Sequence, residues 1–150
     1  MVLSVFTDGY FMKEALKEAQ KAFELDEVPV GAVIVCNDQV IARAHNLTER
    51  LTDATAHAEM QAFTSASNYL GAKFLEECTL YVTIEPCIMC AGAAYWARIG
   101  KIVFGAHDPK KGFSTVNPNI LHPKTKLESG LMEKECSSLM TAYFKMKRVK

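Results

Sequence analysis

The chain has 150 residues, 49% of them hydrophobic, and its 17 basic residues are balanced by 17 acidic ones. This length suits one well-buried core and is short for two ordinary domains, so we expect a single domain over residues 1–150. The longest apolar stretch, Val28 to Cys36, contains Pro29 and Gly31 and is far shorter than the roughly 20 residues that span a membrane. Composition therefore argues against a membrane protein and against a strongly basic nucleic-acid-binding chain.

The five cysteines form an odd set, and no secretory signal pattern opens the chain. Both features argue against a secreted protein held together by disulfides. We expect a cytoplasmic location in a reducing compartment.

The first predicted elements are a helix and a hairpin. Apolar residues from Phe11 to Phe23 recur at helical spacing after Asp8, a plausible N-cap, which predicts an amphipathic helix covering one face of a sheet. Residues Val30 to Cys36 and Val40 to Ala44 flank a turn at 37–39 and predict two antiparallel strands.

The next predicted element is a helix that begins after Asp53 and Thr55 and carries His57 and Glu59. It runs to about residue 69, and Gly71 closes it.

A strand, a helix and a second strand follow. The strands are Thr79 to Ile84 and Ile102 to Gly105, and the helix between them begins with Pro86 and stops at Gly100. This order predicts a right-handed βαβ unit with parallel strands.

Residues 106–123 show no sustained periodicity and predict a long loop at the carboxyl end of a strand, where α/β sheets bind ligands. A last helix is expected from about Met132 to Met146. By spacing it buries Leu131, Leu139, Met140, Tyr143 and Phe144.

Two segments could supply local positive charge. The tail from 145 to 150 carries four basic residues, and Lys110 and Lys111 lie in the long loop. The tail is either a basic patch for a nucleic acid or a solvated helix end, where the helix dipole already favours cations.

Two short motifs carry the chemistry. His57, Cys87 and Cys90 provide three zinc ligands, whereas a closed structural site takes four and a catalytic site leaves the fourth position to water. The cysteines lie at a predicted helix start, which lowers thiol pKa and favours thiolates. Glu59 is then a carboxylate free to move protons as a general acid and base. Together these residues are the minimum set for a zinc-dependent hydrolytic deaminase.

Other interpretations of the cysteine pair are a redox motif or half of a structural zinc site. A structural site lacks a convincing fourth ligand, because Cys36, Cys78 and Cys136 lie in apolar or helical surroundings. Each of the remaining histidines could touch the metal or the substrate or serve the fold alone; they are His45, His107 and His122.

The motifs His-Ala-Glu and Pro-Cys-x-x-Cys resemble those of the cytidine deaminase-like zinc deaminase superfamily. Further segments resemble the bacterial tRNA-specific adenosine deaminases: Glu27–Val33, Ala44–Asn46, Thr55–Met60, Thr79–Thr83, Glu85–Ala93, Phe104–Asp108 and Glu135–Phe144. The resemblance covers residues 10–148.

This resemblance implies a three-layer α/β/α sandwich around a mixed five-stranded sheet, with one Zn²⁺ per chain. It also implies a homodimer that acts on a tRNA anticodon loop and converts the wobble adenosine to inosine. An unpaired loop nucleotide is the cheapest base to extrude into a closed pocket, which fits that substrate.

The resemblance further suggests four substrate contacts. Asn46 would hydrogen-bond the target base and Val30 would pack against it, while Asp108 would contact the ribose-phosphate chain and Phe144 would lie near the substrate. The alternatives are a turn residue for Asn46, a loop cap for Asp108, and core positions for Val30 and Phe144.

Two departures from the family pattern fall where RNA would touch. Phe113 to Asn119 replaces a run of small residues, and His107 replaces an arginine. One rival function is therefore deamination of a free nucleobase or nucleoside of the guanine or cytosine type. The other is a non-catalytic, zinc-stabilised RNA-binding subunit, against which Glu59 argues.

Overall fold

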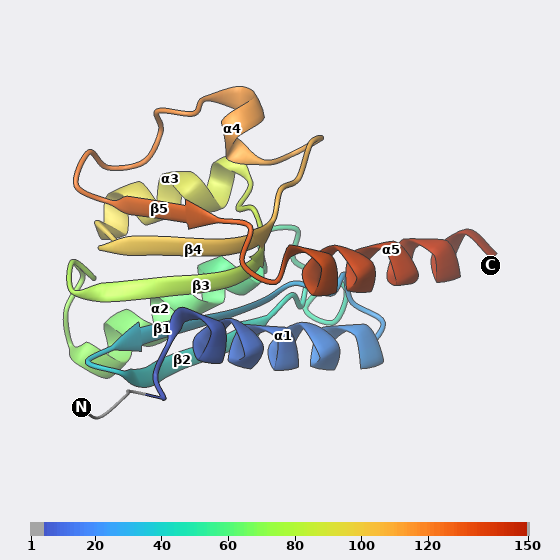
Figure 1. Cartoon of the computed structure of the whole chain (residues 1–150), viewed down its shortest axis with the longest axis horizontal. Helices are drawn as coiled ribbons and strands as arrows, with labels where there is room; N and C mark the ends of the chain where they lie inside the picture. Colours follow the sequence, from blue (N-terminus) through green and yellow to red (C-terminus); the bar gives the residue numbers. More distant parts are fainter. Residues whose placement is uncertain (1–4, 150) are drawn as a thin grey trace.

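The computed structural model describes residues 5–149 and contains a five-stranded mixed sheet of order β2-β1-β3-β4-β5 (Figure 1). β1 pairs antiparallel with both β2 and β3, whereas β3 with β4, and β4 with β5, are parallel. The strands are β1 (Gly31–Cys36), β2 (Gln39–His45), β3 (Cys78–Ile84), β4 (Lys101–Ala106) and β5 (Lys126–Ser129).

Helices cover both faces of this sheet, as Figure 1 shows. The helices are α1 (Asp8–Glu24), α2 (Ala58–Leu70), α3 (Ile88–Ala97), α4 (Phe113–Val116) and α5 (Glu133–Val149). α1 and α5 pack on one face, and α2 and α3 pack on the other. The predicted three-layer α/β/α sandwich with a mixed five-stranded sheet is confirmed.

The core has two parts because side chains alternate across the strands. On β3, Leu80 and Val82 face α2 and α3, while Tyr81 faces α1 and α5. On β1, Ile34 faces α2 and α3, while Val33 faces α1 and α5. All five side chains are buried, so the sheet is the central layer of the fold.

Gly31 lies where β1 meets α1 without room for a side chain. A Cβ atom there would lie 2.1 Å from the carbonyl oxygen of Ala15 and 2.3 Å from the backbone nitrogen of Ala19. We expect Gly31→Ala to lower the free energy of unfolding by roughly 3 kcal/mol. Gly9→Ala is the matched control, because its nearest atom would be 3.7 Å away. Urea unfolding midpoints measure both, and equal midpoints would contradict this packing.

Several element boundaries differ from the sequence prediction. Thr7, not Asp8, caps α1, because its hydroxyl accepts the backbone N–H of Tyr10 at 3.1 Å. α3 stops at Ala97 rather than near Gly100, because Arg98 takes a left-handed conformation with φ 52°.

The predicted long loop is also interrupted. α4 lies within it, and β5 follows before the last helix. All four residues of β5 are exposed, so no apolar pattern marked this edge strand.

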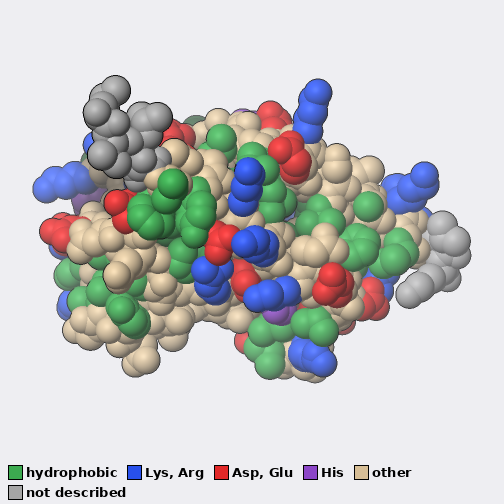
Figure 2. Space-filling view, turned by 60° about the horizontal axis from the view of Figure 1, so that its bottom comes forward, with side chains coloured by type: hydrophobic (Ala, Val, Ile, Leu, Met, Phe, Trp, Pro, Cys, Tyr) green, Lys and Arg blue, Asp and Glu red, His purple; other side chains and the backbone are tan. Residues whose placement is uncertain are grey.

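The outer surface mixes charges of both signs. On the face seen in Figure 2, Lys and Arg side chains lie beside Asp and Glu side chains. Two lysines of α1 pair with glutamates of the same helix, Lys17 with Glu14 and Lys21 with Glu18, both at 2.7 Å. Across residues 5–149, none of the helices is long and apolar enough to cross a bilayer.

Candidate active site

His57 lies immediately before α2, in the N-cap position with φ −71°. The turn before it is held by Asp53, whose carboxylate accepts the N–H and the hydroxyl of Thr55 at 2.8 Å each. Asp53 and Thr55 therefore precede the helix start as predicted, although the first helical residue is Ala58. This arrangement places the His57 side chain at the N-terminus of α2.

Cys87 holds the corresponding N-cap position of α3, three residues after the end of β3, and Cys90 lies in the first turn. Pro86 precedes the N-cap, so the prediction that it begins the helix was wrong by two residues. Both cysteines nevertheless lie at a helix N-terminus, as the sequence predicted.

The three predicted ligands converge. Nδ1 of His57 lies 3.6 Å from Sγ of Cys87 and 3.5 Å from Sγ of Cys90. A tetrahedral zinc site with its usual bond lengths places nitrogen and sulfur about 3.6 Å apart. Within residues 5–149, these three residues form the one cluster of at least three candidate ligands, with ligand atoms all within 4.8 Å of one another. The donor set and its spacing fit one zinc ion.

Hydrogen bonds link the three side chains of the cluster, and a bound cation would take the place of the protons that they share. Hydrogen bonds from Cys90 and His57 lower the pKa of Cys87 to about 4 despite its burial. The Cys87 thiolate in turn raises the pKa of His57 and of Cys90. Zinc requires these ligands without their protons, so the site exchanges protons for the metal on binding.

Glu59 lies beside the ligands but does not belong to the cluster. Its side chain is buried, with a 4% exposed fraction, in the first turn of α2. Desolvation raises the pKa of Glu59 to about 7, and its carboxyl lies within hydrogen-bonding reach of Cys90. A carboxyl with such a pKa can both accept and release a proton at neutral pH.

Asn46 is the residue that follows β2, and its side chain is buried. Its side-chain amide donates to Thr48 at 3.2 Å and to the Glu27 carboxylate at 3.5 Å. Gln61 ties this region to His57, because its amide donates to the carbonyl of residue 45 at 2.8 Å and to that of His57 at 3.3 Å. Val30 is half-buried and packs on both parts of the core.

Asp108 lies in the loop after β4. Its carboxylate accepts the backbone N–H groups of Lys110 and Lys111 at 3.0 Å each, which makes it a loop cap. The same loop folds inward at Phe113, whose side chain is 1% exposed. Phe113 of the altered run is therefore a core residue, whereas residues 114–119 are exposed.

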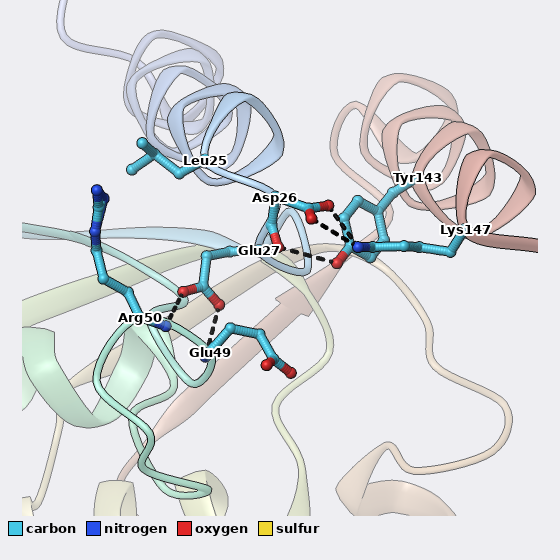
Figure 3. A pocket seen from close by; sticks show the side chains of 7 residues that line it. All are labelled: Leu25, Asp26, Glu27, Glu49, Arg50, Tyr143 and Lys147. Carbon is cyan, nitrogen blue, oxygen red and sulfur yellow. Dashed lines mark hydrogen bonds and ion pairs between the residues drawn. The ribbon is translucent and has the colours of Figure 1, made fainter. Parts of the chain in front are cut away.

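Phe144 lies on α5 and is 44% exposed, so the predicted burial was wrong for this residue. Its neighbour Tyr143 takes the inward position and donates its hydroxyl to the carbonyl of Asp26 at 3.3 Å. Lys147 of the basic tail pairs with the Asp26 carboxylate at 2.7 Å. Tyr143, Asp26 and Lys147 line a cavity of about 520 Å³ that lies between α5, the loop after α1, and Arg50. Figure 3 shows the side chains that line it.

The remaining histidines and cysteines serve other contacts. His45 lies 3.1 Å from the carbonyl of residue 46, His107 lies 3.4 Å from Glu85, and His122 packs on Tyr95. Cys78 and Cys136 are buried and Cys36 is half-buried, and the metal cluster includes none of the three. The cluster therefore has three protein ligands, as a catalytic zinc site does.

Sequence reasoning missed two buried carboxylates, Glu27 and Glu85. Glu27 accepts the backbone N–H groups of Glu49 and Arg50 at 3.0 and 2.7 Å. Both glutamates flank buried strands, and an acidic residue in such a position needs partners. The position of these two acidic residues beside buried strands was the signal available from the sequence, although it did not identify their hydrogen-bond partners.

Comparison with known families agrees with this site. Residues 6–106 match the family described as the cytidine and deoxycytidylate deaminase zinc-binding region. The chain belongs to this zinc-binding deaminase family. The matched region contains all three ligands and Glu59.

The similar members of this deaminase family act on different substrates. The tRNA-specific adenosine deaminase of Bacillus subtilis is 49% identical, with 95% of this chain and 92% of that protein covered. A solved structure from work on A-to-I editing by tRNA:A34 deaminases at the wobble position of transfer RNA has a TM-score of 0.80. It is 44% identical and covers 87% of this chain and 98% of the other. The guanine deaminase of Bacillus subtilis has a TM-score of 0.65 and is 36% identical, with 76% of each chain covered.

Proposed function

We propose that this chain is a tRNA-specific adenosine deaminase that hydrolyses wobble adenosine to inosine. The observation that carries the chemistry is a three-ligand metal cluster with a buried carboxyl, Glu59, beside it. The choice of substrate follows the tRNA deaminase relatives, which match nearly the whole chain at up to 49% identity. The enzyme is a zinc-dependent hydrolase acting on a cyclic amidine.

The catalytic roles follow from the donor set. His57, Cys87 and Cys90 hold zinc, which supplies an activated water at neutral pH. Glu59 accepts the proton of the water that attacks C6 of adenine. It then delivers that proton to a ring nitrogen, and a second proton transfer accompanies the departing ammonia. Burial of Glu59 keeps this proton out of bulk solvent.

The proposed substrate contacts are inferred from where four residues lie in the structure. Asn46 offers an amide to the extruded base, and Val30, the residue immediately before the buried strand β1, packs beside that base. The loop of Asp108 and the exposed ring of Phe144 would meet the RNA outside the base pocket. An anticodon loop presents an unpaired base and therefore suits such a pocket.

We expect Asn46→Ala to lower kcat/KM for the RNA by about 10- to 100-fold, because a hydrogen bond to the base is lost within a buried site. Asn68→Ala is the control, since Asn68 is exposed on the far end of α2. Steady-state inosine formation measures both variants. Equal kcat/KM values for Asn46→Ala and Asn68→Ala would remove Asn46 from the site.

The test of the function is ammonia release from an anticodon stem-loop with adenosine at the wobble position. A stem-loop with guanosine there is the matched control. The proposal expects stoichiometric inosine and ammonia from the adenosine RNA alone. Release from both RNAs, or from neither, would contradict it.

Guanine deamination is the second candidate, because the guanine deaminase of Bacillus subtilis shares 36% identity with this chain. That enzyme covers less of the chain than the tRNA deaminases do, which favours the RNA substrate.

We also propose a single domain over residues 1–150, a cytoplasmic location and a homodimer. α3 supports the dimer, because it carries exposed apolar side chains at Ile88, Tyr95 and Trp96, the last 78% exposed. All five cysteines are free, which supports a reducing compartment. Sedimentation equilibrium tests the dimer, and a monomer at micromolar concentration would contradict it.

A further inference from the structure

Glu85, at the end of β3, is a buried carboxylate with an unusually complete set of donors. One oxygen accepts the N–H of Asp108 at 3.1 Å and lies 3.4 Å from Nδ1 of His107. The other accepts the N–H and the hydroxyl of Ser114 at 3.0 and 2.6 Å. Burial alone would raise the pKa of Glu85, but these hydrogen bonds outweigh it and hold the pKa below the usual range. Glu85 is therefore ionised at neutral pH.

These donors all belong to the segment 107–114, which we call the clamped loop. The clamped loop also contacts the metal-binding residues directly, because Gly112 forms an antiparallel bridge with the ligand Cys87. Phe113 donates its N–H to the carbonyl of Pro86 at 2.9 Å. A Cβ at Gly112 would lie 2.3 Å from the Glu85 carboxyl carbon. The contacts with Glu85 and with the backbone of Pro86 and Cys87 therefore hold the clamped loop in one position.

Lys111 occupies the position next to this bridge. Its backbone N–H is held by Asp108, while its side chain is exposed. Lys111 is therefore an exposed ammonium group on a fixed backbone segment, next in sequence to the residue that bridges to the metal ligand Cys87.

An RNA substrate needs such a group. The chain has no net positive charge, so attraction for a polyanion must come from cations placed near the site. We propose that Lys111 contacts a phosphate of the RNA strand beside the target nucleotide and that Glu85 is the positioning residue that fixes Lys111 there. This inference rests on the proposed RNA substrate.

Binding of the inosine-containing product stem-loop tests the contact, because this RNA cannot react further. We expect Lys111→Met to weaken binding about three- to tenfold at low salt. The slope of log K against log salt should fall by about 0.7, the value for one phosphate of a single strand. Lys126→Met is the control, with an expected slope equal to wild type, because Lys126 is exposed at the start of β5 and the metal ligand Cys87 follows the opposite end of the parallel strand β3. An unchanged slope for Lys111→Met would overturn the contact.

Glu85→Gln tests the positioning role. We expect it to raise KM as Lys111→Met does, with full zinc content and kcat changed less than about twofold. The amides of Asp108 and Ser114 should exchange hydrogen faster, and adding Lys111→Met should then cause little further loss. Ser114→Ala removes one donor only and should give a smaller change of the same kind.

Additive effects of Glu85→Gln and Lys111→Met, or wild-type amide exchange in Glu85→Gln, would overturn the positioning role. A wild-type chain that binds and deaminates the RNA while Lys111→Met behaves like Lys126→Met would overturn this inference alone. A wild-type chain inert toward the RNA would overturn the proposed function, and the inference with it.

Discussion

Replacing Glu59 by Gln is expected to lower kcat for inosine formation by about 10²- to 10⁴-fold with one zinc ion still bound per chain. Gln has the size of Glu but cannot accept the proton of the attacking water and pass it on. Zinc content should not change, because Glu59 is not among the three clustered ligands. Single-turnover rates and metal analysis measure the two effects separately.

The matched control is Glu18→Gln. Glu18 is equally buried, at 4% exposure, but lies on α1 across the sheet from the site and pairs with Lys21. Its replacement should cost stability without reducing kcat. A Glu59→Gln enzyme that keeps more than about a tenth of the wild-type rate would remove Glu59 from proton transfer.

Loss of a metal ligand should have the second large effect. We expect Cys90→Ala to bind zinc more than about 100-fold less tightly and to form no measurable inosine, because two ligands remain. The melting temperature should also fall, since zinc binding contributes to the stability of the folded state. A chromophoric chelator titration measures the metal, and scanning calorimetry measures the stability.

Cys136→Ala serves as the control for a buried thiol. Cys136 is 1% exposed on α5 and lies outside the cluster, so the variant should keep its zinc and its activity. Full zinc occupancy in Cys90→Ala would show that the cluster is not the metal site.

The metal site could be predicted because its signals are local. His57 and Cys87 each hold an N-cap position, and the residues that define those helix starts are neighbours in sequence. The fold then brings the two starts to one end of the sheet. Glu59 follows the same logic, since it lies two residues from a ligand.

The loop contacts could not be predicted, because their partners are distant. Glu85 and Ser114 are 29 residues apart, and two of the donors to Glu85 are backbone groups that have no sequence signature. The burial of Phe113 could not be predicted for the same reason, because it depends on core residues that are distant in sequence. β5 was missed because none of its residues is buried.

The most direct test of the central claim is a competition between substrates. An anticodon stem-loop with wobble adenosine, free adenosine and free guanine would be offered to the same zinc-loaded enzyme, and kcat/KM would be measured for each. The account predicts that only the stem-loop is converted, and at its wobble position. Efficient turnover of guanine with an unchanged stem-loop would keep the metal site and Glu59 in their roles and contradict the RNA substrate.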